Sequence, residues 1–376
     1  MSLRIGVLKE TREGETRVAL VPEVAARFAG EGVELLIEAG AGAAAGLPDA
    51  SFERVRVVRD AAEVLSAADV LLAVQPPATS VVEQMRPETT VVAFLQPHRQ
   101  LPLVRALVAR RLTSFAMELI PRISRAQSMD ALSSQAAAAG YKAVLIAADN
   151  SIKFFPMLTT AAGTIRPAQV LVIGAGVAGL QAIATARRLG AVVHAYDVRS
   201  ATREQIESLG GKFIDTGVAA EGSGGYAREL TDEEKRRQAD VLADHIAKAD
   251  AVISTAAIPG RPAPRIIPRS AVERMSAGAI IVDLAAESGG NCELTKPGET
   301  VEHNGVRIFG PDNLPAGLPR HASEMYARNL YNFLKPALKD GALAIDWQDE
   351  VFVASVLTHA GEVRHAATRA ALETPA

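Results

Sequence analysis

Three glycines with the spacing G-x-G-x-x-G are the residues of this chain best suited to hold a phosphate group. Gly174, Gly176 and Gly179 follow a short apolar run and precede a segment of helical composition. In a strand, turn and helix unit, the first glycine permits the tight turn, the second lets the backbone approach a pyrophosphate, and the third lets the helix pack closely on the sheet. The pyrophosphate would lie on the free amides of the helix N-terminus, where the helix dipole favours negative charge.

An acidic residue completes this dinucleotide-binding pattern. Asp197 ends the next apolar run, close to the spacing expected of a carboxylate that accepts hydrogen bonds from the adenosine ribose. Because a carboxylate repels a 2′-phosphate, NAD is favoured over NADP. Arg199 and Arg203 are nearby and could receive such a phosphate, or could simply begin an exposed helix. A glycine-tolerant unit without a ligand is the alternative. The predicted cofactor contacts are Gly174, Gly176, Val177, Ala178, Gly179, Asp197, Val198 and Arg199.

The elements that must position these residues alternate between short apolar runs and helical patterns, which predicts largely parallel, doubly wound sheets. Strands are expected at 4–8, 33–37, 55–58, 70–74, 91–95, 112–115, 170–173, 192–196, 211–214, 251–254, 279–284 and 306–309. Helices are expected at 22–30, 61–67, 101–110, 134–153, 178–188 and 324–339. The tail, with further strands at 342–346 and 351–356, is expected to pack back on the first domain.

The fold class predicted from this pattern is α/β, with two doubly wound Rossmann-like domains and a cleft between them. The NAD-binding domain, 134–310, is inserted in a first domain made of 1–133 and 311–376. A length of 376 residues and a hydrophobic fraction of 48% suit two or three buried cores.

Composition excludes several function classes. The net charge of −3, without a long block of one sign, gives no indication of nucleic-acid binding. Cys292 is the only cysteine, which excludes an internal disulfide and suits a reducing cytosol, and no metal site is expected. The N-terminus lacks the apolar core of a signal peptide, and glycines and arginines interrupt the longest apolar stretch, so no membrane span is expected.

Three further stretches carry a family resemblance. KETREGETRVALVP, residues 9–22, is similar to the opening shared by alanine dehydrogenases and the NAD-binding subunit of proton-translocating transhydrogenase. Residues 117–135, MELIPRISRAQSMDALSSQ, and residues 283–298, DLAAESGGNCELTKPG, resemble the transhydrogenase version. The resemblance implies direct hydride transfer between NAD(H) on this chain and NADP(H) on a partner domain, coupled to proton movement through a membrane partner. It also implies a homodimer in the cytoplasm, peripheral at the inner face of the membrane through its partner subunits.

The resemblance also assigns site residues. Arg122, Gln127, Asp130 and Ser133 would contact the nicotinamide, its carboxamide and its ribose, and direct hydride transfer needs only positioning and exclusion of water. The alternative for this stretch is a polar loop that caps a helix through Ser128 or Asp130. The glycine-rich loop 217–229 would close over the cofactor with Tyr226 as its latch. Ala257 and Asn313 would lie near the nucleotide, although both segments could be ordinary proline-stiffened loops.

One departure from the family pattern argues against an amino-acid dehydrogenase. Alanine dehydrogenases use a lysine and a histidine to hold and deprotonate the substrate, and the aligned positions here hold Ala73 and Gln96. Oxidative deamination would then lack a proton acceptor. His98 is nearby but is expected to be a surface loop residue. A stand-alone amino-acid dehydrogenase and a non-catalytic NAD-binding protein are the alternatives to a transhydrogenase component.

Overall fold

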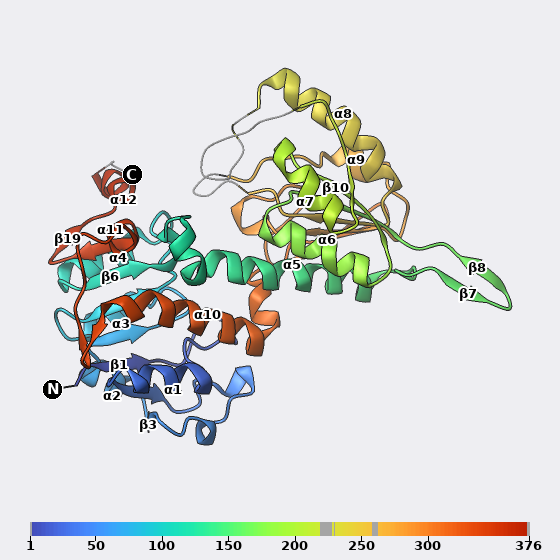
Figure 1. Cartoon of the computed structure of the whole chain (residues 1–376). Coiled ribbons are helices and arrows are strands. Elements are labelled where there is room, and N and C mark those ends of the chain that lie inside the picture. The colour runs from blue at the N-terminus through green and yellow to red at the C-terminus, as the bar shows by residue number, and fades with distance from the viewer. Residues whose placement is uncertain (1, 219–227, 229, 258–261, 374–376) are drawn as a thin grey trace. The chain divides into compact units, whose positions relative to one another are not determined.

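The computed structural model describes residues 2–218, 228, 230–257 and 262–373. Its chain divides into two compact units, Met1–Gln135 with Ala316–Ala376, and Ala136–Pro315. The chain therefore leaves the first unit within helix α5 (Ala131–Asn150) and returns to it within a short 3-10 helix, Leu314–Gly317. Each unit is built on its own sheet, and both sheets are mostly parallel, which confirms the predicted fold class (Figure 1).

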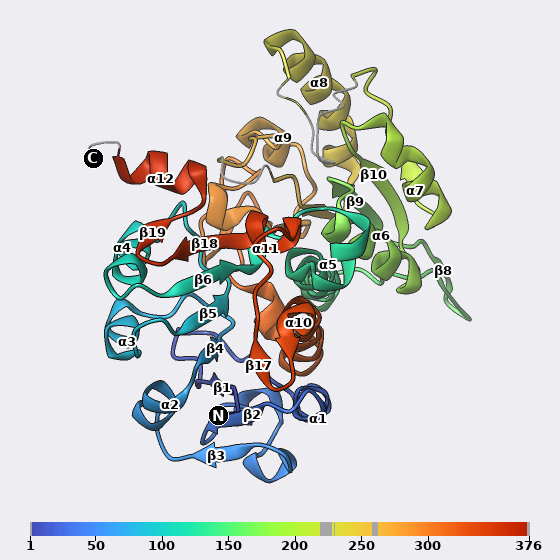
Figure 2. The ribbon, with the colours of Figure 1, turned by 60° about the vertical axis from the view of Figure 1, so that its left-hand side comes forward.

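The first unit contains an eight-stranded sheet in the order β19-β18-β6-β5-β4-β1-β2-β3. Six strands are parallel and wind outward from β1 in both directions, whereas β18 and β19 are antiparallel additions from the C-terminal segment. The strands are β1 Arg4–Val7, β2 Glu34–Glu38, β3 Arg56–Val58, β4 Val70–Leu72, β5 Thr90–Ala93, β6 Thr113–Ala116, β18 Val356–His359 and β19 Glu362–Val363. Figure 2 shows the strands side by side in this order.

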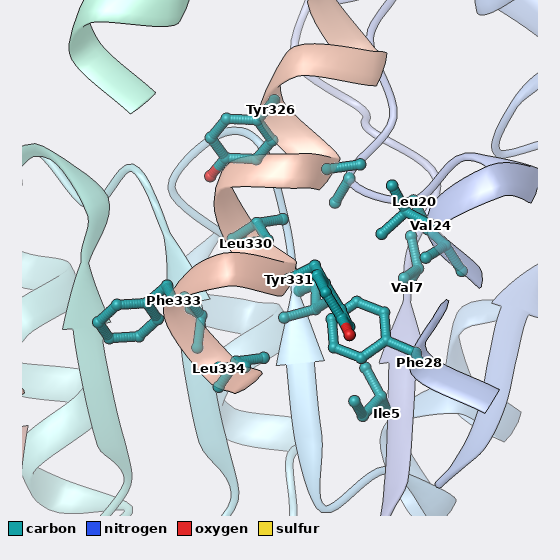
Figure 3. Close-up of a cluster of buried hydrophobic side chains, with 14 of the residues drawn as sticks. Ile5, Val7, Leu20, Val24, Phe28, Tyr326, Leu330, Tyr331, Phe333 and Leu334 are labelled. Carbon is teal, nitrogen blue, oxygen red and sulfur yellow. The ribbon is translucent and has the colours of Figure 1, made fainter. Parts of the chain in front are cut away.

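Helices bury both faces of this sheet. The core on one face contains α2, α3 and α4, and the core on the other contains α1 and α10. Their bounds are α1 Pro22–Gly30, α2 Ala61–Ala67, α3 Thr79–Gln84, α4 Leu101–Ala109 and α10 Pro319–Leu334. Apolar residues recur on one stripe of α10, and Tyr331 packs edge-on against Phe28 of α1 at 5.1 Å between ring centroids (Figure 3). Burial of this stripe holds the C-terminal return on the unit.

The predicted strand at 351–356 is wrong for all but its last residue. Residues Glu350–Ser355 form a short helix, α11, because the Asp349 carboxylate accepts a hydrogen bond from the amide of Val351 and caps the first turn. The helix turns Phe352 onto Phe115 and Phe333, with ring centroids 5.7 and 5.1 Å away. The strand begins only at Val356, where β18 pairs with β6. A further helix, α12, spans Ala366–Glu373.

The second unit contains a seven-stranded sheet in the order β11-β10-β9-β12-β13-β15-β14. All neighbours are parallel except β14 and β15, and the chain crosses over between β9 and β12. In such sheets a ligand binds outside the carboxyl ends of the strands at this switch point. The strands are β9 Gln169–Ile173, β10 Val192–Tyr196, β11 Lys212–Phe213, β12 Ala251–Ser254, β13 Ile280–Asp283, β14 Thr300–His303 and β15 Val306–Phe309.

Two layers of helix cover this second sheet, and one hairpin stands apart from it. Helices α5 and α6 belong to one core, while α8 and α9 belong to the other. The helices are α6 Val177–Arg188, α7 Arg203–Ser208, α8 Asp232–Lys248 and α9 Arg269–Glu273. The unexpected hairpin β7 (Leu158–Thr160) and β8 (Gly163–Ile165) extends away from the sheet with every residue of both strands exposed (Figure 1).

Candidate functional site

The three glycines of the motif form the turn between β9 and α6. Gly174 has a φ of +94°, a left-handed conformation that favours glycine, and a Cβ there would lie 2.7 Å from the hydroxyl of Thr255. A Cβ on Gly179 would lie 1.8 Å from the carbonyl oxygen of Gly174, so the helix can approach the turn only at a glycine. Around Gly176, by contrast, a Cβ would meet nothing within 4 Å. The space above this residue is therefore open.

The first turn of α6 is suited to an anion. Gly176 is the N-cap residue and no side chain caps the helix, so protein side chains leave the first amides unsatisfied. Val177 is exposed and Ala178 is half-buried at this edge. Free amides at the positive end of a helix dipole, next to open space, fit a pyrophosphate.

Asp197 is buried and holds this turn from β10. Its Oδ2 accepts a hydrogen bond from the amide of Ala175 at 2.7 Å, and its Oδ1 accepts from the amide of Arg199 at 2.9 Å. The guanidinium of Arg199 also donates to both oxygens, from Nε at 2.9 Å and from Nη2 at 2.8 Å. The predicted ribose acceptor is thus already engaged, which sequence reasoning did not anticipate.

A pocket of about 230 Å³ opens beside Asp197 at the carboxyl ends of β10 and β11. Within it, Arg203 pairs with Asp215 and lies over the ring of Phe213 at 4.6 Å from the centroid. Its size and its combination of apolar floor and polar rim suit the adenosine end of a dinucleotide. The lining residues are Tyr196, Asp197, Ser200, Arg203, Phe213, Asp215, Thr216, Gly217 and Val218.

Asn291, which was not predicted, fixes the loop that follows β12. Its side chain is fully buried, accepts hydrogen bonds from Ser254 Oγ and the Ala256 amide, and donates to the carbonyls of Ala256 and Pro264. Asp283 in turn accepts from the Asn291 amide at 2.7 Å. These bonds hold Ala256 beside the glycine turn. The only sequence signal was that Asn291 lies within the stretch 283–298 that resembles the family.

The four polar residues predicted from 117–135 line one pocket of about 310 Å³ in the first unit. Arg122 and Gln127 are exposed, and the Asp130 carboxylate accepts hydrogen bonds from the amide and the hydroxyl of Ser133. Asp130 therefore caps the start of α5, so the alternative of a capping role also holds. Both roles are compatible, because the remaining groups still face the pocket. The other lining residues are Pro121, Ile123, Ser124 and Ala126.

The loop that carries this pocket is held by the C-terminal return. Arg125 makes a forked pair with Asp349, with nitrogen to oxygen distances of 3.0 and 2.6 Å. The side chains of Asn329 and Asn332 both donate to the carbonyl of Ser128. Bidentate geometry and two amide donors restrict the loop more than a single surface ion pair would.

A second polar cluster lies at the carboxyl edge of the first sheet. Arg17 and Glu15 form a buried pair at 2.6 Å. Burial acts to raise the pKa of Glu15, but the hydrogen bonds and charge of Arg17 outweigh it and lower that pKa to about 2. Glu10 accepts from the Val74 amide, yet burial raises its pKa to about 7. Each acid therefore serves the protein's own groups.

This cluster corrects one detail of the sequence comparison. Ala73 is 6% exposed and packs in the apolar core, so a side chain there faces away from the polar edge. Gln75 instead accepts from Arg12 and donates to Glu15. Gln75, rather than Ala73, thus occupies the place where a substrate-binding lysine would be useful. Gln96 lies at the same edge with its amide on Glu118, and His98 is exposed, as predicted.

The other predicted contacts have different outcomes. Tyr226 and most of its glycine-rich loop lie outside the described residues. Ala257 is exposed just after β12, and Asn313 has a left-handed φ of +46° with its amide 3.4 Å from a Glu287 oxygen. Val198 is half-buried after Asp197. Among the described residues there is no group of three potential metal ligands, and no helix long and apolar enough to cross a membrane.

Comparisons with known proteins agree with this architecture. Residues 6–139 match the model of the alanine dehydrogenase/PNT N-terminal domain, and residues 143–366 match that of the C-terminal domain. A solved transhydrogenase from Sinorhizobium meliloti superposes with a TM-score of 0.88 at 45% identity, covering 96% of this chain and 99% of that one. A solved L-alanine dehydrogenase shares the fold, with a TM-score of 0.82 over 98% of both chains, at 24% identity.

Curated relatives extend the comparison. The first portion of NAD(P) transhydrogenase subunit alpha, which is a separate chain in Rhodospirillum rubrum, is 46% identical over 97% of this chain and 98% of its own length. NAD(P) transhydrogenase subunit alpha of Haemophilus influenzae is 40% identical, over 95% of this chain and 71% of its own length. Alanine dehydrogenase of Mycolicibacterium smegmatis is 27% identical over 99% of this chain. The chain therefore belongs to the alanine dehydrogenase/PNT family, and within it to the group of NAD(P) transhydrogenase alpha subunits.

Proposed function

We propose that the second unit binds NAD(H) across the turn between β9 and α6. The observation that carries this proposal is the open space above Gly176 next to the uncapped first turn of α6, which fits a pyrophosphate. The pocket beside Asp197 would hold the adenosine end, and the loop after β12, with Ala257, would border the rest of the cofactor. Tyr226 and Asn313 are proposed as further contacts.

We further propose that the chain is the NAD(H)-binding component of a proton-translocating transhydrogenase. Bound NAD(H) supplies a hydride donor or acceptor, and NADP(H) is bound by a partner domain. The chain's own residues contribute position and exclusion of water, because transfer between two nicotinamides needs no side-chain acid or base. Arg122, Gln127, Asp130 and Ser133 are proposed to orient the nicotinamide end, since they line one pocket on a loop that is held on two sides.

Mixing tests this proposal. The chain is combined with a soluble NADP(H)-binding transhydrogenase domain, and hydride transfer from NADH to an NADP analogue is followed by absorbance. The mixture should transfer hydride and neither protein alone should. Gln127→Asn should slow transfer while leaving NADH affinity nearly unchanged, because the exposed side chain serves the approach of the two rings more than ground-state binding. An inert mixture in which both nucleotides are bound would favour a non-catalytic NAD-binding protein.

Partner contacts follow from the same proposal. Membrane and NADP(H)-binding subunits would place the chain at the cytoplasmic face of the membrane. A homodimer is proposed because the β7 and β8 hairpin exposes Met157, Leu158 and Ile165 by 64, 37 and 45%. Such an apolar arm suits a second copy of the chain. Replacing Leu158 and Ile165 with serine should shift the mass measured by light scattering from dimer to monomer.

A further inference from the structure

The ion pair between Arg199 and Asp197 occupies the carboxylate that the proposed function assigns to the adenosine ribose. The Asp197 side chain is 5% exposed and that of Arg199 is 22% exposed, so solvent screens the pair only partly. Two backbone amides and two guanidinium nitrogens already donate to the two carboxylate oxygens. A carboxylate has about four acceptor positions, so a ribose hydroxyl must replace a donor that is already present.

Of these four donors, only the guanidinium can leave without unfolding the turn. The amide of Ala175 belongs to the glycine turn itself, and the amide of Arg199 closes the short loop after β10. The guanidinium is at the end of a flexible side chain that can turn toward solvent. A ribose that needs both Asp197 oxygens therefore competes directly with Arg199.

We propose that Arg199 is a specificity-determining residue that closes Asp197 in the free protein and must release it when NAD(H) binds. This inference rests on the proposed NAD(H) site. Apparent affinity is the intrinsic affinity multiplied by the fraction of molecules in which the carboxylate is open. A pair that is closed nine-tenths of the time therefore weakens NADH binding about tenfold.

The same pair affects rejection of NADP(H). A guanidinium held on Asp197 is not available to a 2′-phosphate, although Arg residues next to the ribose-binding acid are the groups that accept such a phosphate. Removing Arg199 leaves the carboxylate alone to repel the phosphate. Neutralising Asp197 instead frees Arg199 to bind it. The two substitutions should therefore change NADPH affinity in opposite directions.

Calorimetric titration of the full chain with NADH and NADPH tests the proposal. Arg199→Ala should bind NADH roughly tenfold more tightly and NADPH more weakly than wild type. Asp197→Asn should bind NADPH more tightly and NADH more weakly. Arg199→Lys keeps the positive charge but loses the planar fork, so its NADH affinity should lie between those of wild type and Arg199→Ala.

Arg203→Ala is the matched control. It removes a cation from the same pocket, but Arg203 pairs with Asp215 rather than with Asp197. NADH carries a pyrophosphate, so loss of this cation should not tighten its binding. Equal tightening in Arg203→Ala would assign the effect to overall charge and overturn the proposal, as would unchanged or weaker NADH binding in Arg199→Ala. If wild type binds neither nucleotide, the proposed function itself fails.

Discussion

Substitution of the third motif glycine should damage both the fold and the cofactor site. In Gly179→Ala the new methyl group would lie 1.8 Å from the Gly174 carbonyl oxygen, so α6 must move back by about 1.2 Å to reach the 3.0 Å limit that real Cβ atoms respect. Alanine gains up to about 1 kcal/mol of helix propensity over glycine. Overpacking against backbone costs about 1–3 kcal/mol, so we expect a net loss of stability.

The displacement also moves the first amides of α6 away from the turn that they complete. A loss of about 2 kcal/mol of charge-assisted hydrogen bonding to the pyrophosphate corresponds to about thirtyfold weaker NADH binding. Fluorescence titration with NADH measures the affinity, and thermal unfolding followed by circular dichroism measures the stability. Both quantities should fall in Gly179→Ala.

Gly176→Ala provides the matched comparison. Gly176 has φ and ψ of −77° and −168°, which alanine adopts easily, and its Cβ would meet nothing within 4 Å. The unfolding transition should stay within about 0.5 kcal/mol of wild type. NADH binding should nevertheless weaken, because the methyl group fills the space proposed for the pyrophosphate. An unchanged melting temperature in Gly179→Ala, or full NADH affinity in Gly176→Ala, would refute this reasoning.

Three other predictions concern pH, fluorescence and substrate choice. Burial raises the pKa of Glu10 to about 7 in the folded chain, so its protonated form is favoured and stability should fall by up to about 3 kcal/mol as pH rises from 4.5 to 7; Glu10→Gln should flatten this dependence in urea titrations. Trp347, the only tryptophan, has its ring centroid 4.3 Å from that of His359, whose pKa is lowered by burial and by Arg364, so emission should drop only below pH 6.5 and His359→Gln should abolish the drop. Purified chain should not reduce NAD with L-alanine, because Gln75 and Gln96 stand where a lysine and a histidine would be needed; saturable turnover in an absorbance assay would contradict this.

Local pattern alone determined the elements whose residues carry their own signals. The bounds of α1 and α2 match the prediction because proline begins one and Asp60 caps the other. The G-x-G-x-x-G spacing located the turn after β9, since only glycine tolerates the close approaches at Gly174 and Gly179. Alternating apolar runs and helices were sufficient for two doubly wound sheets, because a buried parallel strand must be apolar on both faces.

Tertiary structure decided what depends on partners far away in the sequence. The run after Asp349 is as β-branched and apolar as a strand, yet a capping carboxylate and the aromatic rings of Phe115 and Phe333 make it a helix. Side-chain direction decided that Gln75 faces the polar edge while Ala73 faces the core. The guanidinium fork on Asp197 was equally hidden, because a sequence gives the spacing of an acid and an arginine but not whether the two side chains meet or each faces a ligand.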